Sequence, residues 1–96
     1  MVKEVVVTER ARQEYLAVIK YLSEEWTVKE IEKFEQKFLK AVSFLESNPK
    51  AFPISQKNIR KYVLDKNNII FYRIKKEIIE IVSVWTTKKS PKKLKR

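Results

Sequence analysis

The sequence predicts an α+β domain in which two helices pack on one face of a small, mainly antiparallel sheet. Three observations predict it: an N-terminal β-branched segment, two consecutive helical patterns, and three strand-like segments separated by short polar turns. A chain of 96 residues has room for one hydrophobic core, and 44% hydrophobic residues are enough to fill it. We therefore expect a single domain over residues 1–87, followed by a basic C-terminal tail over residues 88–96.

The N-terminal half predicts a strand followed by a helical hairpin. Val2–Thr8 is rich in β-branched residues, which favour strands. Apolar residues then recur every three or four positions over Glu9–Trp26, the spacing of one helix face. Thr27 and Glu30 match a capping box, which predicts a second helix that ends near Ser47. Because almost no loop separates the helices, we expect them to pack antiparallel as a hairpin.

The C-terminal half predicts a three-stranded antiparallel meander. Ile59–Leu64, Asn68–Ile74 and Ile78–Thr86 are rich in β-branched and aromatic residues, and short polar turns separate them. The run Ile69–Tyr72 in the middle strand is apolar on both faces, so we expect that strand inside the sheet. The predicted order of elements is β-α-α-β-β-β.

The residue types that are missing exclude several functions. The chain contains no cysteine, histidine or glycine. It therefore has no thiolate nucleophile, no imidazole base or metal ligand, and no glycine-rich phosphate loop. We expect neither a cofactor nor a metal ion. No apolar run approaches the length of a membrane span or a secretion signal, so we expect a soluble, cytoplasmic protein without membrane contact.

The positive charge is concentrated at one end of the chain. Residues 1–56 carry nine basic and nine acidic residues, whereas residues 57–96 carry thirteen basic and three acidic ones. The whole net charge of +10 therefore lies in the last forty residues. This asymmetry indicates a surface that faces a polyanion or an acidic protein. The alternative for the tail is a disordered, solubilising end.

Short patterns along the chain add a family resemblance. They are Val7-Thr8 before Ala11, Tyr21-Leu22 and Glu25-Trp26, Phe38 with Leu45-Glu46-Ser47-Asn48-Pro49, Ile59-Arg60-Lys61, Ile70-Phe71-Tyr72-Arg73-Ile74, Ile81-Val82-Ser83-Val84-Trp85, and Ser90-Pro91-Lys92-Lys93-Leu94. No one of these patterns is specific. In this order and with this plan of elements, nearly the whole chain resembles the RelE/ParE toxins of bacterial type II toxin–antitoxin systems, also known as plasmid stabilisation proteins.

The resemblance implies a toxin that arrests growth and is neutralised by a cognate antitoxin. Such antitoxins usually wrap an acidic C-terminal segment around the toxin, so a toxin–antitoxin hetero-oligomer is the expected assembly. Two modes of action occur in the superfamily. RelE-like toxins are mRNA interferases that cleave mRNA on the ribosome, whereas ParE-like toxins inhibit DNA gyrase and cleave no nucleic acid.

Several residues of this chain differ from those at matching positions of the RNA-cleaving toxins, and these differences favour the ParE-like mode. Arg60 stands where the cleaving toxins commonly have an arginine, and it is the best catalytic candidate if the chain is a ribonuclease. Ile69 stands where several of them have a second arginine. Thr86-Thr87 replaces the expected Arg or His, and no tyrosine follows Tyr72. A general acid–base pair is therefore missing from the matching positions. We lean towards a non-enzymatic toxin, with a ribosome-dependent endoribonuclease as the alternative.

Basic side chains are the candidates for binding the target or the antitoxin. They are Arg60, Lys61, Arg73, Lys88, Lys89, Lys92 and Lys93. A structural reading stands beside the functional one for two of them. Arg60 could be a surface residue or pair with Asp65 or Glu80, and Arg73 is more simply a sheet-edge arginine whose stem packs on Trp85.

Two readings outside toxicity also remain open. The first is a small nucleic-acid-binding module, in which Tyr62, Tyr72 and Trp85 would stack on bases; strand spacing favours core packing for these rings instead. The second is a non-toxic relative that has kept only antitoxin binding, because a fold does not fix a function.

Overall fold

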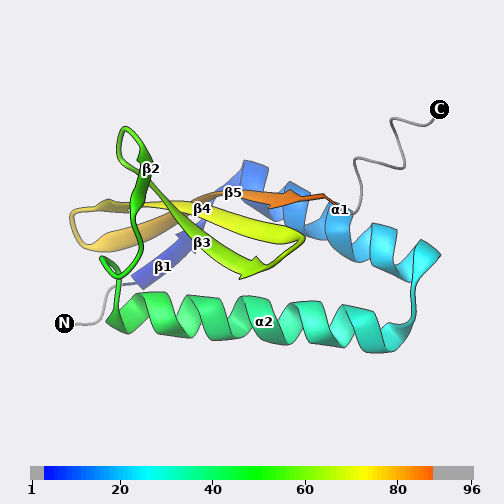
Figure 1. The fold of residues 1–96 in the computed structure, drawn as a ribbon. Coiled ribbons are helices and arrows are strands. Elements are labelled where there is room, and N and C mark those ends of the chain that lie inside the picture. Colours follow the sequence, from blue (N-terminus) through cyan, green and yellow to red (C-terminus); the bar gives the residue numbers. More distant parts are fainter. Residues whose placement is uncertain (1–3, 88–96) are drawn as a thin grey trace.

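In the computed structural model, which describes residues 4–87, two helices pack against a five-stranded sheet (Figure 1). The elements are β1 (Glu4–Val7), α1 (Glu9–Glu25), α2 (Val28–Ser47), β2 (Ile54–Gln56), β3 (Ile59–Asp65), β4 (Asn68–Lys75) and β5 (Ile78–Thr86). The strand order is β1-β5-β4-β3-β2, with β1 parallel to β5 and every other pair antiparallel. The predicted α+β fold is confirmed.

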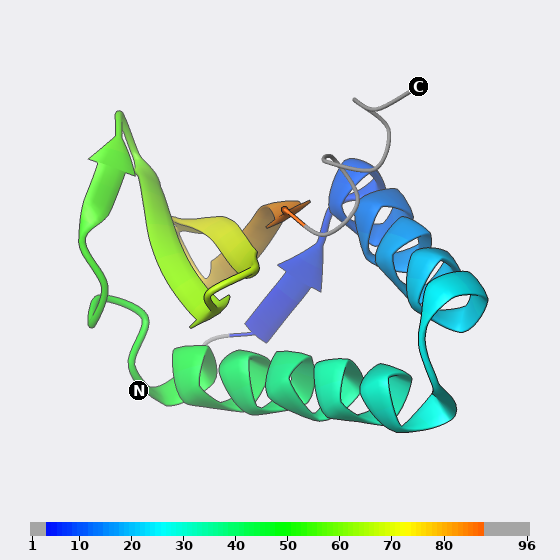
Figure 2. The ribbon, with the colours of Figure 1, turned by 45° about the vertical axis from the view of Figure 1, so that its right-hand side comes forward.

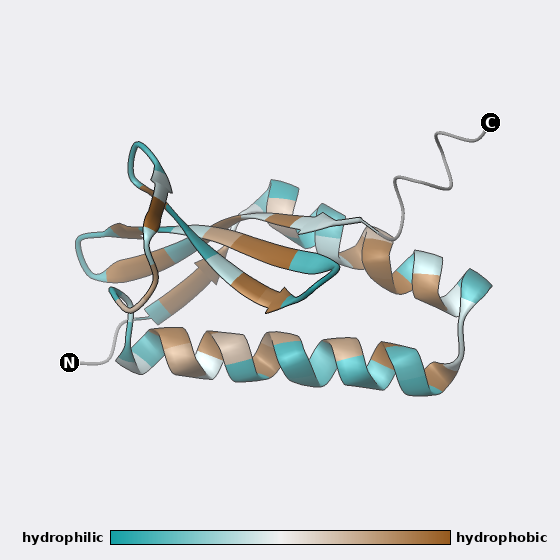
Figure 3. Ribbon diagram, in the orientation of Figure 1, coloured by the Kyte–Doolittle hydropathy of each residue, from teal (hydrophilic) through white to brown (hydrophobic). Residues whose placement is uncertain are grey.

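Strand β4 occupies the middle of the sheet, as its two apolar faces predict. Its residues Ile70 and Tyr72 are completely buried, and on the neighbouring strand so are Ile79 and Ile81. The helices contribute Ala11, Val18, Leu22, Phe34, Phe38, Ala41 and Leu45 to the same core. Hydrophobic residues therefore concentrate in the strands and alternate with polar ones along the helices, while the turns are polar (Figure 3).

Both helices lie on the same side of the sheet, as Figure 2 shows. They contact each other through Tyr15, whose ring centroid lies 5.4 Å from that of Phe34 and 4.7 Å from that of Phe38. The apolar stripes predicted for the helices point into this layer, except at Trp26. That residue caps the C-terminus of α1 and is 50% exposed, because the chain turns there towards α2.

The two helix starts differ from each other. Thr8 caps α1, because its hydroxyl oxygen accepts a hydrogen bond from the Ala11 amide at 3.1 Å. Thr27 is the N-cap of α2, but its side chain makes no capping hydrogen bond, so the predicted capping box is wrong in its chemistry. The start of α2 is instead closed by backbone bonds from Glu30 and Ile31 to the Thr27 carbonyl.

Strand β2 was not predicted. It is a three-residue edge strand, Ile54–Gln56, that follows Pro53 and pairs with β3 through an irregular register. Its side chains are exposed, so no hydrophobic alternation marks it in the sequence. The chain then turns at Lys57, which adopts a positive φ of 47° without the help of a glycine.

A carboxylate on α1 fastens this helix to β5. Strand β1 pairs with β5 only as far as Ile81, and the register of β5 shifts just beyond that point. There the Glu14 carboxylate accepts hydrogen bonds from the Val84 amide at 2.8 Å and from the Ser83 hydroxyl at 2.9 Å. Glu14 thus satisfies an amide of β5 that β1 is too short to reach.

The same hydrogen bonds control the ionisation of Glu14. Partial burial acts to raise the pKa of this carboxyl, but the hydrogen bonds from Val84, Ser83 and Arg10 outweigh burial and hold the pKa below its ordinary value of 4.5. Hydrogen bonds of this kind stabilise the ionised carboxylate more than the neutral acid.

We predict that Glu14→Gln lowers the free energy of unfolding at pH 7 by about 1 kcal/mol, because the amide keeps an acceptor oxygen but loses the charge that strengthens these hydrogen bonds. A group whose pKa is lower in the folded state stabilises the fold above its unfolded pKa, and this contribution disappears as the pH falls through the folded pKa. The difference between wild type and variant should therefore shrink below about pH 4. Urea unfolding at several pH values measures it, with the exposed Glu24→Gln as control. A difference that does not change with pH would contradict this role.

Candidate functional site

The face of the sheet opposite the helices carries a row of apolar side chains that are exposed or half-buried. Strand pairing aligns Val63 with Ile69 and Ile69 with Trp85, so the row crosses β3, β4 and β5. Alternation along β4 points Ile69 away from Ile70, which is in the core. Val63 is 53% exposed and Trp85 46% exposed. We call Lys61, Val63, Ile69, Phe71, Arg73, Glu80 and Trp85 the uncovered face.

The charges of the uncovered face are few and mostly paired. The Arg73 guanidinium binds the Glu80 carboxylate across β4 and β5, with an Nε–Oε1 distance of 2.6 Å. Lys61 is exposed beside Phe71 and has no ion pair within residues 4–87. A surface with an apolar row at its centre suits a protein partner.

Arg60 points the other way. Its Nη1 atom donates a hydrogen bond to the Phe52 carbonyl at 2.6 Å, on the side of β3 that faces the core. It lies near Tyr72, whose hydroxyl donates to the Pro49 carbonyl at 2.8 Å. Burial raises the pKa of the Tyr72 phenol, against the opposing effects of the Arg60 charge and the Phe52 amide. Arg60 and Tyr72 together hold the segment that joins α2 to β2.

Comparison with known proteins supports a family. Residues 5–91 match the family model of the ParE toxin of the type II toxin–antitoxin system parDE. The fold is similar to that of a chain of the chromosomal ParDE toxin–antitoxin system from P. aeruginosa, with a TM-score of 0.74, 18% identity, and coverage of 88% of this chain and 96% of that one. No curated protein sequence matches the chain.

Other solved toxins share the fold at lower similarity. The YoeB dimer from Staphylococcus aureus gives a TM-score of 0.63 at 13% identity, covering 88% of this chain and 97% of that one. A double mutant of the E. coli toxin RelE in the free state gives a TM-score of 0.58 at 15% identity, covering 95% of this chain and 90% of that one. The family match extends over nine-tenths of the sequence.

The chain belongs to the ParE toxin family.

This assignment confirms the resemblance to the RelE/ParE superfamily drawn from the sequence. The toxin's predicted site residues are nevertheless not brought together. Lys61 and Arg73 lie on the uncovered face, whereas Arg60 lies on the opposite side of β3. Lys88, Lys89, Lys92 and Lys93 fall outside the described residues. They stay predictions.

Several finer expectations for the toxin are corrected. Arg60 pairs with neither Asp65 nor Glu80, because a backbone carbonyl binds it. Arg73 lies on the central strand and not at a sheet edge, and its cross-strand neighbour is Glu80, whereas Trp85 faces Ile69. Tyr72 is in the core, as the strand spacing predicted, and Tyr62 packs against the core beside Phe52. Trp85 is exposed.

Sequence reasoning missed the apolar row itself. On β3 the signal was present, because Val63 alternates with Tyr62 and Leu64, which pack against the core. On β5 it was not, because Trp85 is in phase with the core residues Ile79 and Ile81 and is turned outward only by the register shift beyond Ile81. The continuous apolar run Ile69–Tyr72 in β4 concealed which face was covered. The described part of the toxin has no group of three or more acidic side chains that could hold a metal ion, and none of its helices is long and apolar enough to cross a membrane.

We predict that Arg60→Ala lowers the free energy of unfolding by about 2 kcal/mol, because it removes a charge-assisted hydrogen bond to a carbonyl. Lys61→Ala, next along the strand and exposed on the other face, should change it by less than about 0.5 kcal/mol. Urea unfolding of both variants makes the comparison. Equal stability of the two would show that Arg60 does not support the loop before β2.

Proposed function

We propose that this toxin acts by binding DNA gyrase through the uncovered face and that it cleaves no RNA. The observation that carries the proposal is the apolar row Val63–Ile69–Trp85 on three adjacent strands, in which Val63 and Trp85 are exposed and Ile69 between them is half-buried. Exposed apolar surface of this kind favours a protein partner. The match to the ParE family also supports this proposal.

Among the described residues no acid–base group is assembled, which also supports the proposal. In-line attack of a ribose hydroxyl on its phosphate needs a base, an acid and cations near one another. Within residues 4–87, Arg60 is bound to a carbonyl and Arg73 to a carboxylate. Thr87 is bound to Asn67 by two hydrogen bonds. Its amide donates to the Asn67 carbonyl at 2.8 Å, and its hydroxyl donates to Asn67 Oδ1 at 3.0 Å.

For the antitoxin we propose an acidic C-terminal segment that contacts Lys61 and the basic residues 88–96. The net charge of +10 would steer such a segment to the toxin. We further propose that residues 1–87 make up the toxin domain, with residues 88–96 as its tail, and that the protein acts in the cytoplasm.

The test uses the full-length toxin in two assays run side by side. One follows supercoiling of relaxed plasmid by gyrase, and the other maps RNA ends after cell-free translation of a supplied mRNA. We expect inhibited supercoiling and intact mRNA. Cuts in phase with codons would instead make this an mRNA interferase, and inactivity in both assays would contradict toxicity.

Two surface variants locate the activity. Val63→Asp places a charge in the apolar row and should weaken gyrase inhibition at least about tenfold, the effect of losing roughly 1.4 kcal/mol of binding. Leu39→Asp makes the same change at a 66% exposed position on α2 and should have no effect. Equal losses in both variants, with both folded by circular dichroism, would place the binding surface elsewhere.

A further inference from the structure

A polar pocket lies between the helices and the β3–β4 turn. Its volume is about 130 Å³, and it is lined by Val18, Leu22, Glu30, Lys33, Phe34, Lys37, Asp65 and Asn68. Three buried apolar side chains, those of Val18, Leu22 and Phe34, form its wall. The volume is several times what one water molecule needs.

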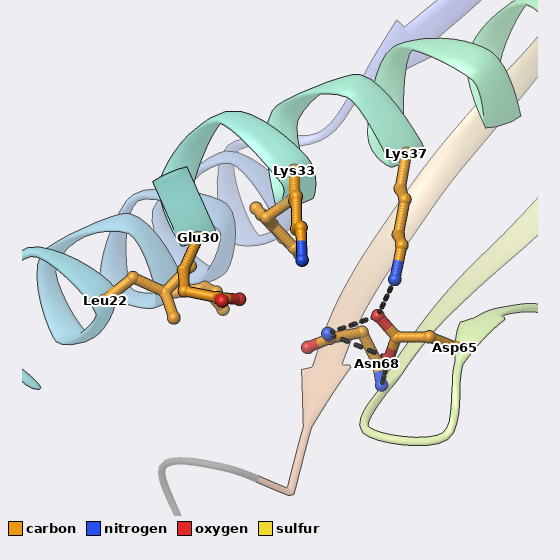
Figure 4. A pocket seen from close by; sticks show the side chains of 8 residues that line it. Leu22, Glu30, Lys33, Lys37, Asp65 and Asn68 are labelled. Carbon is orange, nitrogen blue, oxygen red and sulfur yellow. Dashed lines mark hydrogen bonds and ion pairs between the residues drawn. The ribbon is translucent and has the colours of Figure 1, made fainter. Parts of the chain in front are cut away.

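One polar atom inside this pocket has no partner. Asn68 is only 4% exposed, and its Oδ1 atom is buried without a hydrogen bond in the described part of the chain. The orientation of the amide is fixed, because its Nδ2 atom donates to Asp65 Oδ1 at 3.1 Å, and a reversed amide would put oxygen against that carboxylate. Figure 4 shows the free oxygen turned away from Asp65, towards the side of the pocket that holds Glu30.

Two charged groups of the pocket lining, those of Glu30 and Lys33, are also available to a ligand. Lys37 is occupied, because its ammonium binds Asp65 Oδ2 at 2.9 Å. Lys33 and Glu30 both point into the pocket from α2 (Figure 4) and form no ion pair with any of residues 4–87. The pocket therefore presents two acceptors, the Asn68 oxygen and the Glu30 carboxylate, beside one donor, the Lys33 ammonium.

This set of groups selects among ligands. The two lysines and two carboxylates that line the pocket cancel in charge. A simple ammonium group would satisfy both acceptors, but it would give the pocket a net positive charge and leave the Lys33 ammonium without an acceptor. A phosphate or carboxylate would satisfy Lys33 but bring negative charge against Glu30, Asp65 and a carbonyl oxygen. A carboxamide has two N–H donors and an adjacent carbonyl, which match the two acceptors and the single donor.

We propose that this pocket binds a carboxamide group, whose N–H donors meet Asn68 Oδ1 and Glu30 and whose carbonyl accepts from Lys33. The group comes either from a free small molecule or from a glutamine or asparagine side chain of a partner. The site is separate from the uncovered face, so its occupancy does not depend on the proposed function.

The test is a titration of the ¹⁵N-labelled full-length protein, followed by NMR chemical shifts. The probes are acetamide, free L-glutamine and N-acetylglutamine N-methylamide, which presents the side chain as a peptide does. We expect saturable shifts that include the Asn68 side-chain amide and the residues around Lys33. Preference for the capped amide would indicate a partner side chain, and preference for free glutamine a small molecule.

Paired variants decide whether the pocket is responsible. Glu30→Gln and Lys33→Met should each weaken binding about threefold to tenfold, the usual effect of losing one hydrogen bond. Glu32→Gln and Lys40→Met repeat these changes at exposed positions of α2 outside the pocket and should leave binding unchanged. The proposal is overturned if no probe gives saturable shifts, if sodium phosphate binds in preference to the amides, or if all four variants behave alike.

Discussion

The attachment of α1 to β5 is the constraint on which the rest of the structure depends. Thr8 extends the β1–β5 ladder with a 3.0 Å bond from its amide to the Ile81 carbonyl, and its hydroxyl caps the helix that begins at the next residue. Glu14, almost two turns later, bonds to β5 again at Val84. The helix axis is thereby fixed at two points against a strand that comes seventy residues later in the chain. Because β5 also pairs with β4, this attachment places α1 on one side of the sheet, and Tyr15 packs against α2 there.

Within residues 4–87 the helices cover one side of the sheet only, so the other face is available to the proposed partner. The core takes Ile70, Tyr72, Ile79 and Ile81, and alternation turns their neighbours outward. In a monomer the outward residues are ordinarily polar. Here they include Val63 and Trp85, while Arg73 and Glu80 neutralise each other. The uncovered face is consequently apolar at its centre, which connects the fold to the proposal of a protein target.

The sequence predicted the parts of the fold that depend on local pattern and failed where contacts between distant residues decide. Helical spacing located α1 and α2, and the apolar run at Ile69–Tyr72 predicted the inner strand. The short edge strand β2 has no hydrophobic alternation and was missed. Glu14 looked like any other helix carboxylate, because its partners lie across the fold. For the same reason a motif could suggest Arg60 for function but could not reveal that it faces the Phe52 carbonyl.

The most direct test of this account is photo-cross-linking in cells with a benzophenone amino acid placed at Val63, on the uncovered face. The same amino acid at Leu39, on the exposed side of α2, is the control. If the apolar row binds the target, position 63 should cross-link to a gyrase subunit and position 39 should not. Cross-links from position 63 to mRNA or ribosomal RNA would contradict the account and make the uncovered face an RNA-binding surface.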